Sequence, residues 1–125
     1  MRAPNPALAV HGALARGVFA VAVLVSLAVL FAPASDVPSA PAGVDKVVHL
    51  ALFAALALTG RWAGIGARAL APMLLVYAAV SEVVQGLSAL DRSMSLADWV
   101  ADAVGVLLGL VAWAALAARR SPSPR

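Results

Sequence analysis

The chain has 125 residues, of which 63% are hydrophobic and 12% charged, and its mean hydropathy is +0.96. A water-soluble domain of this size could not bury so much apolar surface, so the composition indicates an integral membrane protein. The lack of cysteine excludes disulfides and thiolate chemistry, and the net charge of +3 comes from singly scattered basic residues, which excludes a nucleic-acid-binding patch.

Four apolar segments predict an all-α integral membrane bundle of four transmembrane helices, at approximately residues 13–33, 45–60, 68–87 and 96–118. Spanning a bilayer takes roughly 20 residues at about 1.5 Å each, so the first segment must begin near Ala13. Loops rich in proline, glycine and small polar residues separate the segments. The predicted organisation is therefore a cytoplasmic segment 1–12, a membrane domain 13–118 and a cytoplasmic tail 119–125.

The basic residues predict a multi-pass protein of the plasma membrane with both termini in the cytoplasm. In that orientation Lys46 and Arg92 lie outside, and seven arginines lie inside: Arg2, Arg16, Arg61, Arg68, Arg119, Arg120 and Arg125. The three tryptophans, Trp62, Trp99 and Trp113, are expected near the membrane interfaces, where amphipathic rings anchor helix ends.

A rival interpretation of the first segment is a cleaved signal peptide. Arg2 and Arg16 precede an apolar run, and Ala32-Pro33-Ala34 has the small-x-small form of a cleavage site. Cleavage there would leave three helices instead of four.

Ionisable side chains within the predicted helices need an explanation, because each costs several kcal/mol unless it is paired, protonated or hydrated. In the second helix, Lys46 and Asp45 stand three and four residues before His49, which places all three along one face. In the third helix, Glu82 and Gln85 share a face near the outer end. These residues are expected to converge near the outer membrane surface.

The fourth helix carries a stripe of four residues, Asp98, Asp102, Gly105 and Gly109, at positions i, i+4, i+7 and i+11. The two glycines belong to a ladder of small residues and are assigned to close helix packing. Arg92, in the loop before this helix, can fold over the outer mouth. The predicted ligand-binding cluster is therefore Asp45, Lys46, His49, Glu82, Gln85, Arg92, Asp98 and Asp102.

Three motif blocks occur in order on successive helices. They are Asp45-Lys46-x-x-His49, Ser81-Glu82-x-x-Gln85, and the run from Arg92 through Ser95, Asp98 and Asp102 to Gly105 and Gly109. Together they resemble the VanZ-like family of bacterial membrane proteins over about residues 44–110. The family's usual asparagine is replaced here by Asp102, which puts an amide hydrogen-bonding role at this position in doubt. The resemblance implies a four-helix protein of the cell envelope, and some relatives are associated with resistance to glycopeptide antibiotics such as teicoplanin.

The first functional hypothesis is a non-enzymatic protein that binds membrane amphiphiles, either a lipid-linked envelope precursor or a lipoglycopeptide. Lys46 and Arg92 would meet phosphate or carboxylate groups, and Glu82, Asp98 and Gln85 would orient them. No cofactor and no nucleic-acid partner are expected. No spacing among His49, Glu82, Asp98 and Asp102 is a recognised metal-ligand motif, so no metal is predicted.

Three alternatives remain open. One is an intramembrane enzyme that acts on a lipid or envelope headgroup, with His49 as general base and Glu82 or Asp98 orienting it. Another is proton-coupled transport. In the third, the polar side chains only hold the helices in register, with His49 bonded to Asp45 or Glu82, and Glu82 paired with Lys46, Arg92 or His49.

Overall fold

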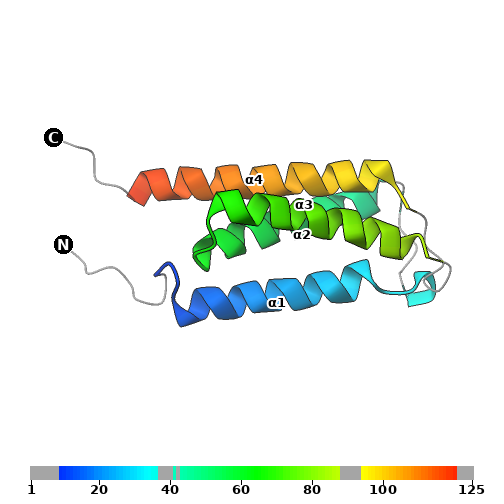
Figure 1. Ribbon diagram of the computed structural model, residues 1–125, viewed down its shortest axis with the longest axis horizontal. Helices are drawn as coiled ribbons and strands as arrows, with labels where there is room; N and C mark the ends of the chain where they lie inside the picture. Colours follow the sequence, from blue (N-terminus) through cyan, green and yellow to red (C-terminus); the bar gives the residue numbers. More distant parts are fainter. Residues whose placement is uncertain (1–8, 37–40, 42, 88–93, 121–125) are drawn as a thin grey trace.

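The computed structural model describes residues 9–36, 41, 43–87 and 94–120, and this part of the chain is helical throughout, with no strand. Its elements are α1 (Ala13–Leu30), the short 3₁₀ turn η2 (Ala34–Asp36), α2 (Val44–Trp62), α3 (Ala67–Gln85) and α4 (Leu96–Arg120). Helices α1 and α3 run in one direction and α2 and α4 in the other, so α1 begins and α4 ends at the same end of the bundle (Figure 1). The predicted all-α fold is confirmed, and every observed helix end lies within three residues of its predicted position.

The surface of the bundle indicates a membrane protein. Among the described helices, α1, α3 and α4 are long and apolar enough to cross a membrane. Many large apolar side chains point outward, among them Val21, Leu24, Val76, Val83, Leu107 and Val111. A set of polar and charged side chains, among them His49, Glu82 and Asp102, is buried instead, an arrangement unusual for a water-soluble domain. Helix α2 has 19 residues but is not among the three apolar helices, since it carries Asp45, Lys46 and Arg61.

The turn between α2 and α3 ends α2 with a left-handed glycine. Gly64 has φ +100°, a conformation that side chains with a Cβ rarely adopt. Its N–H donates to Arg61 O at 3.0 Å, and the Ile65 N–H donates to Gly60 O at 3.0 Å, the bond pattern of a Schellman motif. The turn fixes where α3 begins its return across the bundle.

Helices α2 and α4 form the most extensive contact of the bundle, because two glycines of α4 bring the backbones together. A Cβ at Gly105 would collide with the carbonyl oxygen of Leu50, and one at Gly109 would collide with that of Ala54 and lie 2.7 Å from the Ala57 Cβ. The structure thus places Gly105 and Gly109 where the packing role requires them. The stripe on α4 is pressed against the face of α2 that carries His49.

The apolar core includes residues of all four helices: Leu30, Phe53, Leu56, Ala57, Leu70, Leu74, Ala78 and Val106. Helix α1 is fixed to α3 by two polar contacts. The hydroxyls of Ser26 and Tyr77 lie 2.9 Å apart, and the Gln85 side-chain amide donates to the Leu30 carbonyl at 2.8 Å. Neither of these two contacts involves a charged group.

Candidate functional site

Four ionisable side chains from three helices meet inside one end of the bundle, and we call them the polar cluster: His49, Glu82, Asp98 and Asp102. His49 lies in the second turn of α2, Glu82 in the last turn of α3, and the two aspartates in the first two turns of α4. Antiparallel packing brings these helix ends together. His49 is 2% exposed, Glu82 3%, Asp98 8% and Asp102 0%, so the cluster is enclosed by protein.

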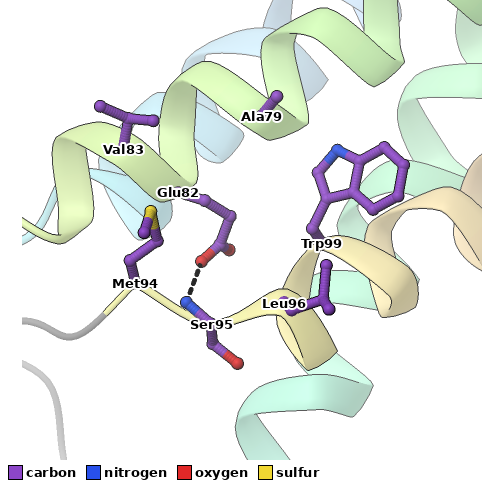
Figure 2. A pocket seen from close by; sticks show the side chains of 7 residues that line it. All are labelled: Ala79, Glu82, Val83, Met94, Ser95, Leu96 and Trp99. Carbon is purple, nitrogen blue, oxygen red and sulfur yellow. Dashed lines mark hydrogen bonds between the residues drawn. The ribbon is translucent and has the colours of Figure 1, made fainter.

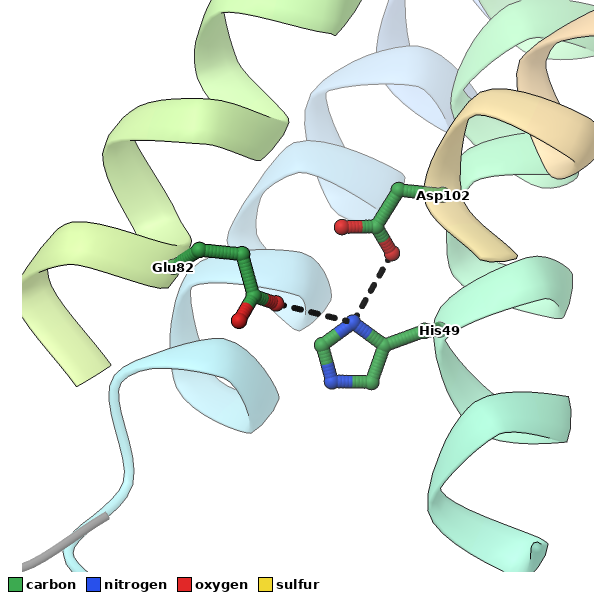
Figure 3. Close-up of side chains that lie close together, drawn as sticks. All are labelled: His49, Glu82 and Asp102. Carbon is green, nitrogen blue, oxygen red and sulfur yellow. Dashed lines mark hydrogen bonds and ion pairs between the residues drawn. The ribbon is translucent and has the colours of Figure 1, made fainter. Parts of the chain in front are cut away.

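The centre of the cluster is the Nδ1 atom of His49. It lies 2.8 Å from Oδ1 of Asp102, within hydrogen-bond distance, and 3.8 Å from Oε1 of Glu82 (Figure 3). Both carboxylates therefore address the same ring nitrogen. The predicted partners of His49 were Asp45 or Glu82, and the observed hydrogen-bond partner is Asp102, because the glycines of α4 bring Asp102 directly against α2.

The outer side of the cluster is closed by a lysine and a carboxylate. The Lys46 ammonium donates to Oδ1 of Asp98 at 3.2 Å and lies 3.6 Å from Oδ2 of Asp45. The other oxygen of Asp98, Oδ2, is 3.9 Å from Nε2 of His49. Lys46 and Asp45 are about half exposed, with 46% and 55% of their side-chain surfaces accessible, so they form the edge between the cluster and the outside.

The carboxylate of Glu82 holds the start of α4. Its Oε2 accepts the backbone N–H of Ser95 at 3.0 Å, while the Ser95 hydroxyl accepts the N–H of Asp98 at 3.2 Å as an N-cap. A negative charge at this position is favoured by the unpaired N–H groups and the dipole of the helix. Glu82 thereby joins α3 to α4.

Two buried oxygen atoms of the cluster are left without a hydrogen bond from any described residue: Oε1 of Glu82 and Oδ2 of Asp102. Buried polar atoms are nearly always paired, and leaving one unpaired costs about 1–3 kcal/mol, and more for a charged group. Both atoms belong to the carboxylates that face His49. The described residues alone do not satisfy the interior of the cluster.

A groove between the end of α3 and the start of α4 runs beside Glu82 (Figure 2). It has a volume of about 270 Å³ and is lined by Ala79, Glu82, Val83, Met94, Ser95, Leu96 and Trp99. Most of its described wall is apolar, and among the described residues that line it only Glu82 is ionisable. We call this feature the α3–α4 groove. It places an apolar surface next to a buried carboxylate.

The structure brings six of the eight predicted site residues together: Asp45, Lys46, His49, Glu82, Asp98 and Asp102. Gln85 is buried too, but its amide donates toward α1, so it serves packing there. Arg92 lies outside the described residues. The observed roles of two residues were not predicted. Ser95 is the hydrogen-bond partner of Glu82. Trp99 was expected to anchor the helix at the membrane interface, but it lines the groove, and its indole nitrogen lies 3.4 Å from the Leu75 carbonyl oxygen.

Comparison with known proteins gives no further guide to this site. The chain matches no protein-family model, no curated protein and no solved structure. The resemblance to the VanZ-like family therefore stays a prediction, and the function has to be argued from the cluster and the groove.

Proposed function

We propose that this chain is a multi-pass, VanZ-like protein of the bacterial plasma membrane that binds an amphiphile at the α3–α4 groove and the polar cluster. In this proposal both termini are cytoplasmic and the cluster faces outward. The protein acts by binding and is not an enzyme, and it contributes to glycopeptide resistance of the teicoplanin type.

A fourth crossing by α2 follows from the direction of the chain. If α1, α3 and α4 cross the membrane, α2 must return the chain from the end of α1 to the start of α3. Its 19 residues cover about 28 Å at 1.5 Å per residue, close to the hydrocarbon thickness. Its charged residues lie in its first and last turns, where side chains reach the interface, and His49 is buried against α4.

The observation that carries the binding proposal is the apolar groove beside Glu82. Its wall includes outward-facing side chains such as Val83, which is 56% exposed, so an acyl or isoprenyl chain can enter it from the bilayer. Glu82 then offers a carboxylate, which accepts hydrogen bonds. The fitting headgroup is one rich in hydroxyl or amide donors, with an anionic group directed toward Lys46.

Two ligand sources share this chemistry, a lipid-linked sugar precursor and a lipoglycopeptide antibiotic. Binding should be measured on purified full-length protein in detergent, with a polyprenyl diphosphate sugar and with teicoplanin as separate probes. Replacing Ala79 by Phe places a bulky side chain in the groove. Binding of the true ligand should weaken by at least about tenfold, since each displaced methylene costs about 0.8 kcal/mol and a chain segment contains several.

The matched control is Ala117→Phe, which places the same side chain in a hollow at the opposite end of α4. That variant should bind like the wild type. Equal binding by the Ala79→Phe and Ala117→Phe variants would refute the groove as the site. Glu82→Gln separates binding from structure: weaker binding by the folded variant supports the proposal, while normal binding with lower thermal stability would assign Glu82 to structure.

The hydrogen bond between His49 and Asp102 favours an intramembrane enzyme as the second candidate. In that case Asp102 would orient the imidazole, in place of the predicted Glu82 or Asp98. However, the remaining ring nitrogen, Nε2, faces Asp98 inside the bundle. A substrate would have to displace this carboxylate, so binding beside Glu82 explains the geometry better.

A further inference from the structure

We propose that His49, Glu82 and Asp102 form a binding site for one divalent transition-metal ion such as Zn²⁺. The site shares Glu82 with the proposed amphiphile site, but its test contains no lipid ligand, so the two proposals can fail independently. A metal site requires that donor atoms converge, that these atoms lack other hydrogen-bond partners, and that the surrounding groups carry a net negative charge for a cation to balance.

The donor atoms converge from three different helices. One ligand atom from each residue lies within 4.8 Å of the others, and Nδ1 of His49 is 2.8 Å from Asp102 Oδ1 and 3.8 Å from Glu82 Oε1. Ligands of a tetrahedral Zn²⁺, at about 2.0–2.2 Å from the metal, stand about 3.3 Å from one another. The three side chains point toward one another (Figure 3), and the observed 2.8 and 3.8 Å lie on either side of that spacing.

The same carboxylates hold the two oxygens that lack hydrogen-bond partners among the described residues, Glu82 Oε1 and Asp102 Oδ2. Both side chains are more than nine-tenths buried, with 5% and 0% of their surfaces exposed. Their carboxylates point toward the imidazole in the space between the three helices. A cation bound by Oε1 of Glu82 would give this atom a partner that the described residues do not supply, and binding through both oxygens of Asp102 would do the same for Oδ2.

The charges of the cluster call for a divalent ion. Lys46 and Asp98 offset each other at 3.2 Å. Of the described cluster residues, Glu82 and Asp102 then remain, and with a neutral imidazole as the third ligand one divalent cation would balance the negative charges of these two carboxylates. A protonated His49 would balance only one of them.

The Asp98 carboxylate faces the ring nitrogen of His49 that such a metal would leave free. A metal bound at Nδ1 leaves Nε2–H free, and metal-bound histidines usually direct this group to a carboxylate. Oδ2 of Asp98 lies 3.9 Å from Nε2, and Lys46 holds Asp98 in turn. An imidazole ligand favours Zn²⁺ and its transition-metal neighbours over Mg²⁺ and Ca²⁺, which prefer oxygen alone.

The test uses full-length protein purified in detergent and stripped with a chelator, to which Zn²⁺ alone is added. Equilibrium dialysis with elemental analysis should find one Zn²⁺ per chain, and the thermal unfolding midpoint should rise on binding. The chain has two histidines, which provide a matched pair. His49→Gln should lower Zn²⁺ affinity by about 100-fold or more, His11→Gln should leave it unchanged, and Asp98→Asn should weaken it by about 10- to 100-fold.

A second measurement needs no variant, in case His49→Gln does not fold. X-ray absorption of the zinc-loaded wild type should show one imidazole nitrogen and otherwise oxygen ligands. The proposal is overturned if no stoichiometric zinc binds, if His11→Gln abolishes binding, or if the absorption spectrum shows oxygen ligands only. Since lipid is absent from both measurements, failure here leaves the groove experiment unaffected.

Discussion

Replacing Gly105 by alanine tests the contact on which the polar cluster depends. The new Cβ would collide with the carbonyl oxygen of Leu50 and lie 3.1 Å from the backbone nitrogen of Ala54. Both are backbone atoms of α2, so no side-chain rotation relieves the contact. Helices α2 and α4 would have to separate, and His49 would move away from Asp102 with them.

The magnitude follows from two opposing effects. Overpacking a well-packed interface costs about 1–3 kcal/mol, and a backbone obstacle places this substitution in the upper half of that range. Alanine recovers about 1 kcal/mol of helix propensity over glycine. We therefore expect Gly105→Ala to lower the free energy of unfolding by about 1–2 kcal/mol.

The control is Gly17→Ala in α1, where an added Cβ meets nothing within 4 Å. It receives the same gain in helix propensity without the collision, so the two variants should differ by about 2–3 kcal/mol. Unfolding in mixed micelles, titrated with sodium dodecyl sulfate and followed by circular dichroism, measures the difference. A Gly105→Ala protein as stable as the Gly17→Ala protein would refute the close α2–α4 contact.

Two further predictions concern the first helix and the topology. Tyr77→Phe removes the 2.9 Å contact with the Ser26 hydroxyl, which keeps its bond to the Val23 carbonyl, so the same titration should show a loss of only about 0.6 kcal/mol. The chain has no native cysteine, so a membrane-impermeant maleimide on intact cells should label the Asp45→Cys variant, and should label the Arg119→Cys variant only after permeabilisation. Labelling of both variants on intact cells would contradict the four-crossing topology.

The helices could be predicted from the sequence because apolar runs alternate with proline- and glycine-rich loops. This pattern set the helix ends to within three residues, even in α3, which contains Pro72. A close approach of α4 to a neighbouring helix was also readable, since Gly105 and Gly109 follow Asp98 and Asp102 along one stripe, but the sequence did not identify α2 as that neighbour. A spacing of three or four residues reliably fixes which side chains share a helix face.

Pairing between helices could not be predicted in the same way. Glu82 and Gln85 share a broad face of α3, yet Glu82 reaches α4 and Gln85 reaches α1, because side chains three residues apart diverge by about 60° around the helix axis. Likewise, sequence spacing left more than one carboxylate as a possible partner of His49. The hydrogen bond between His49 and Asp102 depends on how α4 is rotated against α2, and packing around the glycines determines that rotation.

Charged side chains are not the only means of holding two helices of this bundle together. Neutral contacts perform that task elsewhere, between the Ser26 and Tyr77 hydroxyls and between Gln85 and the Leu30 carbonyl. A charged side chain at membrane depth costs about 2.5–3.5 kcal/mol, whereas such neutral contacts stabilise by about 0.6 kcal/mol without this cost. If the cluster only held the helices in register, amide and hydroxyl side chains would do so at a lower cost in free energy. Oε1 of Glu82 and Oδ2 of Asp102, which receive no hydrogen bond from the described residues, add to this cost and favour the proposal that the carboxylates bind a ligand or cation.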